Sequence, residues 1–248
     1  MPNPTATVGS IVADDFRAAA VFQKHGIDFC CGGQRPLDEA CRTRGADVAQ
    51  VAAELDVATS SGPEAPRFKT WSVDMLARYI TSNHHAYVRQ AIGTIGAHTR
   101  KVADVHGERH PEARQIAAIF ASLADELTSH LEREEQVLFP YIDALAVAQM
   151  TGAAPAVGPE QAIDAMRVMG DEHEAAGAAM AEIRRLSGGY APPPDACTTY
   201  RVAYQELAAF EADLHQHVHL ENNILFPKSL ALERRLKGFA DAPVSVQG

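Results

Sequence analysis

Two eleven-residue segments of the chain carry the same spacing of metal-binding residue types. HLEREEQVLFP (130–140) and HVHLENNILFP (217–227) align without a gap, and each has glutamate four residues after its first histidine. One more histidine precedes each segment, at 46 residues before the first and 44 before the second. Imidazole and carboxylate groups together suit iron, manganese or zinc, whereas copper(I) prefers sulfur. The pattern therefore predicts a metal site made by six residues: His84, His130, Glu134, His173, His217 and Glu221.

Helical periodicity places these six residues on apolar stripes. In the first repeat, the stripe runs through Leu127, His130, Glu134 and Val137 in steps of three and four residues. Carboxylates in an apolar interior cost several kcal/mol each unless a positive charge compensates them. Residues four apart on a helix share one face, and a carboxylate can bridge ions about 3.5–4 Å apart. Two bound cations would therefore satisfy both pairs and both single histidines.

The remaining histidines are interpreted as ordinary side chains. His215 and His219 are also four residues apart, but they lie on the opposite face from His217, so they are expected to be solvated. A lone helical histidine is most often a surface residue or a satisfied core residue. The others have no partner in the repeat and are treated in that way: His25, His85, His98, His106 and His110.

The elements that must position the six residues are four long helices. Helical periodicity covers 72–105, 111–148, 159–187 and 195–235, and strand signals are weak. Since each repeat is a helix with histidine followed by a helix with His-x3-Glu, a duplicated helical hairpin is the simplest interpretation. The predicted fold is all-α, an antiparallel four-helix bundle preceded by a small helical domain. The predicted divisions are a domain at 1–57, a linker at 58–71, the bundle at 72–235 and a flexible tail at 236–248.

Two adjacent thiols form a second candidate site. Cys30 and Cys31 lie in FCCGGQRP, and a disulfide between neighbours would be strained, because their Cα atoms are only about 3.8 Å apart. Arg35 and the start of a helix near Pro36 are expected to lower the thiol pKa values. The pair could trap one ion, complete a site across a dimer, or accept a disulfide or a nitrosyl group. The alternative is that both are structural cysteines at a tight turn.

The amino-acid composition limits the classes of protein to which the chain can belong. The 248 residues are 46% hydrophobic, which suits one bundle and a smaller appendage. The net charge is −10 and basic residues do not cluster, so nucleic acid is not an expected partner. There is no run of about 18 apolar residues and no basic-then-apolar leader, so we expect a cytoplasmic protein without a membrane span.

The bundle motif resembles the hemerythrin-like domain, whose pattern is His, His-x3-Glu, His, His-x3-Glu. With Cys-Cys-Gly-Gly in front and EEQVLFP and LENNILFP in the bundle, nearly the whole chain resembles the repair-of-iron-centres family, di-iron proteins that repair iron-sulfur clusters. The resemblance implies two non-haem iron ions held by the six residues, with Glu134 and Glu221 bridging beside an oxo group. It also implies that damaged iron-sulfur proteins are the partners and that iron is donated to them.

Three functional hypotheses follow. The leading one is a repair factor, rather than an enzyme, that restores clusters damaged by nitric oxide or peroxide, with Cys30 and Cys31 serving in docking, reduction or ion transfer. A second is an enzyme that reduces nitric oxide at the iron pair. A third is a hemerythrin-like sensor or carrier of oxygen or nitric oxide, although the additional histidine of oxygen carriers has no counterpart here. A homodimer is compatible with all three.

Overall fold

The computed structural model describes residues 5–60, 66–152 and 159–238. Within these ranges every named element is a helix, so the predicted all-α fold is confirmed. The chain divides into two compact units: unit 1 comprises 1–77, 141–158 and 218–248, and unit 2 comprises 78–140 and 159–217. In the described part of the chain no helix is both long enough and apolar enough to cross a membrane.

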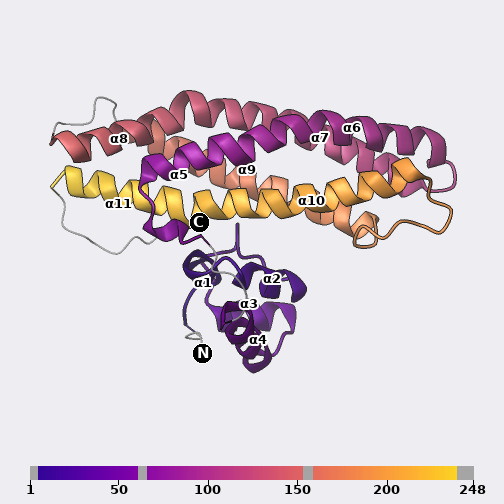
Figure 1. Cartoon of the computed structure of the whole chain (residues 1–248), viewed down its shortest axis with the longest axis horizontal. Helices are drawn as coiled ribbons and strands as arrows, with labels where there is room; N and C mark the ends of the chain where they lie inside the picture. Colours follow the sequence, from indigo (N-terminus) through magenta and orange to yellow (C-terminus); the bar gives the residue numbers. More distant parts are fainter. Residues whose placement is uncertain (1–4, 61–65, 153–158, 239–248) are drawn as a thin grey trace. The chain divides into compact units, whose positions relative to one another are not determined.

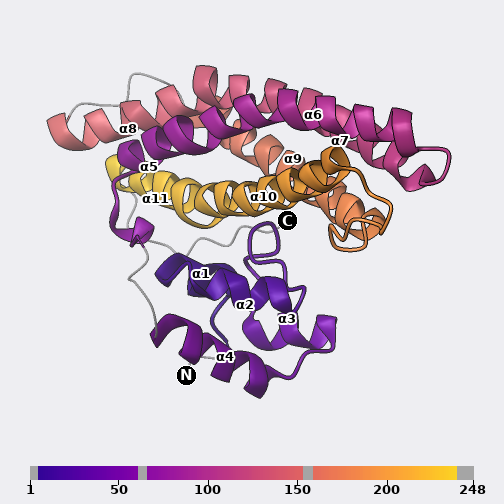
Figure 2. The ribbon, with the colours of Figure 1, turned by 45° about the vertical axis from the view of Figure 1, so that its right-hand side comes forward.

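Unit 2 is a bundle of four long helices. These are α6 (Ala86–His106), α7 (Pro111–Arg133), α9 (Pro159–Leu186) and α10 (Thr198–Leu220), which runs three residues into unit 1. They lie side by side in two views of the molecule (Figures 1 and 2), and α7 packs along both α6 and α9. With the shorter helices and π turns that continue them, the helical stretches of the structure are 73–106, 111–151, 159–186 and 198–236, and the predicted segments agree with these to within three residues at each end. The core is apolar, with buried Ile95, Ile116, Phe120, Leu123, Met180, Ile183, Leu207 and Phe210.

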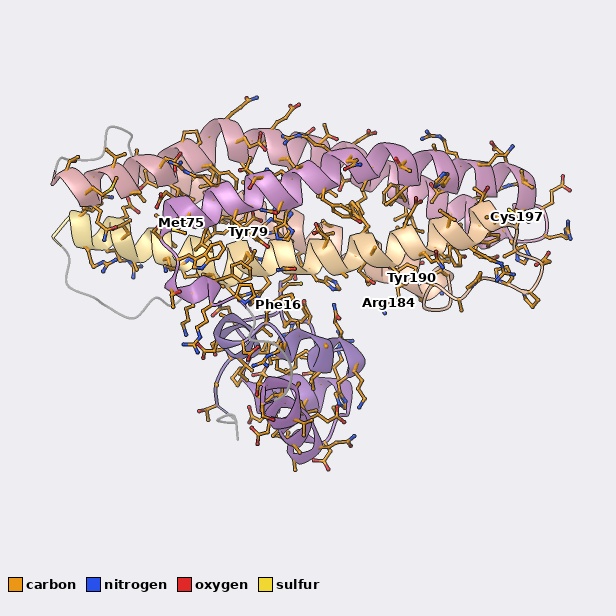
Figure 3. The ribbon with its side chains drawn as sticks, viewed as in Figure 1. Phe16, Met75, Tyr79, Arg184, Tyr190 and Cys197 are labelled. Atoms are coloured by element: carbon orange, nitrogen blue, oxygen red, sulfur yellow. The ribbon has the colours of Figure 1, made fainter. Side chains whose placement is uncertain are left out.

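Helix ends in unit 2 follow from local chemistry. Pro111 begins α7, where its missing N–H costs no helical hydrogen bond. After α9 the chain turns through residues with positive φ, including Tyr190 at 64°. The Tyr190 hydroxyl donates to Glu211 at 2.9 Å, and Arg184 pairs with the same carboxylate while lying 5.3 Å from the Tyr190 ring centre (Figure 3). These contacts hold the turn that returns the chain to α10.

Three π-helical turns lie within the long helical stretches. They are η2 (Ile80–His85), η3 (Glu134–Leu138) and, in unit 1, η4 (Glu221–Leu225). The helical path continues without a break through them: α5 (Val73–Tyr79) precedes η2, α8 (Phe139–Thr151) follows η3, and α11 (Phe226–Leu236) follows η4. A π turn contains one residue more than an α turn, and such turns occur often at functional sites. All three include residues of the repeated pattern or its neighbours.

Unit 1 contains a small group of helices. They are α1 (Val8–Asp14), α2 (Ala18–Lys24), α3 (Leu37–Arg44) and α4 (Val48–Ser60), followed by the 3₁₀ turn η1 (Phe68–Thr70). Their core consists of buried Val8, Val12, Phe22, Phe29, Leu37, Val51 and Leu55. Since α4 extends to Ser60, the start of the predicted linker is helical. Residues 61–65 of that linker and 239–248 of the predicted tail lie outside the described residues.

Candidate metal centre

Five buried side chains of unit 2 converge in the middle of the bundle, and we call them the bundle cluster: His85, His130, Glu134, His173 and His217. His85, Glu134 and His217 offer ligand atoms within 4.8 Å of one another, and so do His130, Glu134 and His173. All five are at most 3% exposed. The residues come from four separate helical segments, so helix packing, rather than one local turn, brings them together.

Glu134 belongs to both groups and lies between them. One of its carboxylate oxygens is 3.3 Å from Nε2 of His85 and 3.5 Å from Nε2 of His130. The residue is 0% exposed, and a lone ionised carboxylate in such a place would be costly. A carboxylate that can reach two neighbouring ions is the expected bridging ligand of a two-metal centre.

The imidazoles of His130 and His173 face each other with their Nε2 atoms 3.1 Å apart. Two lone pairs at this distance would repel, and only a proton or a cation between them makes the arrangement favourable. Two nitrogen ligands about 2.0–2.1 Å from one metal ion naturally lie about 3 Å apart. The donor set and its spacing therefore fit a bound cation.

Carboxylates outside the cluster orient two of its imidazoles. Nδ1 of His85 is 2.7 Å from Glu135, and Nδ1 of His130 is 2.7 Å from Glu172. A hydrogen bond from Arg89, followed by that from His85, holds the pKa of Glu135 below its usual value. Burial opposes ionisation of Glu172, but His130 and Arg133 outweigh it and lower its pKa. Each carboxylate thus accepts the Nδ1 proton, so that Nε2 faces Glu134, the arrangement found around many metal-bound histidines.

The first histidine of the cluster differs from the sequence prediction, because His85 rather than His84 lies in a ligand group. An α-helical step of four residues leads from Ile80 to His84, but the π turn η2 requires a step of five and leads to His85. His84 is buried beside the cluster, with its ring parallel to that of His217 at 5.5 Å and Nδ1 2.9 Å from Asp213. The adjacent pair His84-His85 was the only sign of this ambiguity in the sequence.

The same effect shifts the stripe after Glu134. Val137 was predicted to be buried, but it is 46% exposed, and Leu138 is buried instead. The π turn η3 adds the extra residue that moves the stripe by one position.

Glu221, the second predicted bridging residue, belongs to unit 1. It is 0% exposed and follows His217 by four residues on the helical path from α10 into η4. Residues four apart on a helix lie on one face of it. The second repeat therefore presents histidine and glutamate together, as the first does.

A cavity of about 490 Å³ borders the second ligand group. Its lining includes His130 and His173, and Arg133 and Glu172 also lie along it. Small molecules or ions in this cavity would meet ligand imidazoles directly.

Residues 28–33, which we call the Cys loop, form the second predicted site. Cys30 is buried and Cys31 half-buried, and their sulfur atoms are 3.9 Å apart, so no disulfide joins them. Asp28 Oδ1 accepts hydrogen bonds from the backbone N–H groups of Cys30 and Cys31, both at 3.0 Å. The Cys30 pKa is raised, chiefly by hydrogen bonding with Cys31 and by burial, with Asp28 adding to the effect. The predicted lowering is therefore wrong for Cys30, because it ignored Asp28 and burial.

His219 was predicted to be solvated, but it is 1% exposed. In unit 1 its ring contacts Phe16 and Phe29 at 6.0 and 5.8 Å between ring centres, and burial lowers its pKa to about 4. Asn223, one turn later, donates to the carbonyl groups of Phe29 and Cys30. The sequence prediction failed because the N-terminal helices cover this face of the helix.

Two protein families match the chain. Residues 76–229 match the family described as the hemerythrin HHE cation binding domain, and residues 4–59 match ScdA_N, described as a domain of unknown function. The first match covers the described helices that carry the bundle cluster. The second covers the Cys loop.

Several known proteins are similar to most of the chain. An iron-sulfur cluster repair protein ScdA of Staphylococcus haemolyticus is 30% identical over 221 residues, covering 89% of this chain and 96% of that protein. Iron-sulfur cluster repair proteins YtfE of Yersinia pestis and Yersinia pseudotuberculosis are each 32% identical over 224 residues, covering 90% of this chain and 96% of theirs. The similarity therefore spans both the Cys loop and the bundle.

Proposed function

Since the chain belongs to the family of iron-sulfur cluster repair proteins, we propose that it repairs iron-sulfur clusters damaged by oxidative or nitrosative stress. The iron for repair comes from a pair of non-haem ions held in the bundle. Its partners are damaged iron-sulfur proteins, and its place of action is the cytoplasm.

The observation that carries this proposal is the position of Glu134, which belongs to both ligand groups. When iron is bound, His85 and His217 would hold one ion and His130 and His173 the other, with Glu134 as their shared ligand. The resemblance to the repair family adds Glu221 and an oxo group as further bridging ligands. Nitrogen and carboxylate donors of this kind suit iron. The ligands that the chain itself supplies to the ions are imidazole and carboxylate groups, and sulfur ligands of a damaged cluster compete well with such donors for iron. Transfer to a client cluster is therefore favourable.

The repair function is tested with aconitase whose cluster has been damaged by nitric oxide. Protein loaded with iron should restore aconitase activity faster and further than the same amount of free ferrous iron. Glu134→Ala should abolish this gain, whereas Glu132→Gln, which alters an exposed carboxylate two residues away, should retain it. Recovery of aconitase activity no better than with free iron would contradict the proposal.

The cavity beside His130 and His173 favours a second candidate, binding or reduction of nitric oxide at the iron pair. A diatomic molecule entering there meets the metal-binding face of the second group. Catalysis would consume many molecules of nitric oxide per protein when a reductant is supplied without oxygen. Stoichiometric binding would stop at the number of iron ions, so the two outcomes are readily separated.

A further inference from the structure

The Cys loop contains three metal-binding side chains within one short segment of unit 1. Asp28, Cys30 and Cys31 each offer a ligand atom, and these atoms lie within 4.8 Å of one another. We propose that they form a second cation site, which binds one thiophilic divalent cation through two thiolates and one carboxylate.

The distance between the two sulfur atoms fits this assignment. They are 3.9 Å apart, nearly twice the length of a disulfide bond of about 2.05 Å. Two thiolates bound at about 2.3 Å to a tetrahedral ion would lie about 3.8 Å apart. The loop therefore already holds the sulfur atoms at the separation that a single ion requires.

Asp28 is fixed at the place where a third ligand is needed. Its Oδ1 is 3.2 Å from the Cys30 sulfur, and its Oδ2 accepts a hydrogen bond from the Gly32 N–H at 2.9 Å. The loop backbone donates two hydrogen bonds to Oδ1 and one to Oδ2, so one of the about four acceptor positions of the carboxylate, on Oδ2, remains for an ion. The thiol proton between Cys30 and Asp28 marks the position that a cation would take.

The rest of unit 1 keeps the loop in this conformation. The Asn223 side chain donates to the carbonyl oxygens of Phe29 and Cys30 at 3.2 and 3.0 Å. A Cβ atom at Gly33 would lie 2.3 Å from the Asn223 amide oxygen, so only glycine permits this approach. A site that is rigid before binding loses little entropy when the ion arrives.

The site is open, as a site for transfer must be. Asp28 is exposed and Cys31 is half-buried, and three protein ligands leave a tetrahedral ion with one free position. Binding replaces two thiol protons by one divalent cation, so two protons go to solvent and no electrons are exchanged. That ferrous iron is the natural ion rests on the proposed repair function, but the existence of the site does not.

The test is titration of the iron-loaded full-length protein with Cd²⁺, without oxygen and in a phosphine reductant. We expect one ion to bind per chain with near-ultraviolet thiolate-to-cadmium absorption and release of about two protons, while the iron content stays constant. Cys30→Ser and Cys31→Ser should each remove the absorption. Asp28→Asn keeps an oxygen for the N–H groups of Cys30 and Cys31 but loses the charge and the acceptor of the Gly32 N–H, and should weaken binding at least about tenfold.

Two controls match these variants. Cys197→Ser removes an exposed thiol in unit 2, and Asp38→Asn removes a carboxylate in α3, so both should bind cadmium as the unmodified chain does. Circular dichroism establishes that each variant is folded. Absorption that persists in Cys30→Ser, or a folded Asp28→Asn that binds with unchanged affinity, would overturn the proposal.

Discussion

The bundle cluster and the Cys loop are two groups of metal-binding residues built in opposite ways. The bundle cluster draws its five residues from helices separated by up to 132 positions, and all are buried. The Cys loop takes its three from four consecutive positions, and its aspartate is exposed. The first offers nitrogen and carboxylate donors and the second mainly sulfur. A buried nitrogen and oxygen site suits storage, whereas an open site with sulfur ligands suits exchange.

The largest expected effect is that of removing the carboxylate shared by the two ligand groups. Glu134→Ala should lower the iron content from about two ions per chain to nearly none, because neither group keeps its bridging ligand. Cadmium binding at the Cys loop should survive, which would separate the two sites. Metal analysis of purified protein measures the first effect, and Glu132→Gln is the control. Retention of both ions would contradict the role of Glu134.

A smaller effect should distinguish the two adjacent histidines. His85→Ala should lose about one ion per chain, because His85 lies in a ligand group, while His84→Ala should retain nearly two. Metal analysis and the absorption spectrum of the iron pair provide the measurement. If His84→Ala lost the ion instead, His84 rather than His85 would be the ligand. The α-helical register would then be correct, and the π turn η2 would not determine which histidine faces the cluster.

Removal of iron should destabilise the bundle without affecting the Cys loop. Ligand at 100 times its dissociation constant contributes about 2.7 kcal/mol, and about 1 kcal/mol shifts Tm by 2–4 °C in a chain of this size. Chelation should therefore lower the melting temperature by about 5–10 °C in far-ultraviolet circular dichroism. A double Cys30→Ala, Cys31→Ala variant should show the same shift. An unchanged Tm would mean that the buried carboxylates do not need cations.

Some features of the bundle cluster and the Cys loop could be predicted from the sequence, and others could not. The His-x3-Glu pairs and the four helices could be predicted because the same residue types occur twice in the chain at matched spacing. His85 was missed because a π turn changes the register by one residue, and hydrophobic periodicity assumes α-helical steps. The burial of His219 depends on contacts with Phe16 and Phe29, some 200 residues away in the chain, which no local pattern contains. Nothing in the sequence distinguishes Asp28 from the other acidic residues, because only the folded turn places its carboxylate beside the thiols.

The smallest expected effect tests what holds the Cys loop in place. Asn223→Ala removes the donor to two loop carbonyl groups, and an unsatisfied buried polar group costs about 1–3 kcal/mol. Opening of residues 29–33 should become easier by a similar amount, so alkylation of Cys31 should accelerate about 5- to 150-fold. The iron content should not change, since Asn223 belongs to neither ligand group. Asn222→Ala, which removes the neighbouring amide, is the control. Equal rates in the two variants would mean that the helices of unit 1, rather than Asn223, keep the thiols at 3.9 Å. The Cys loop would then depend on helix packing, as the bundle cluster does.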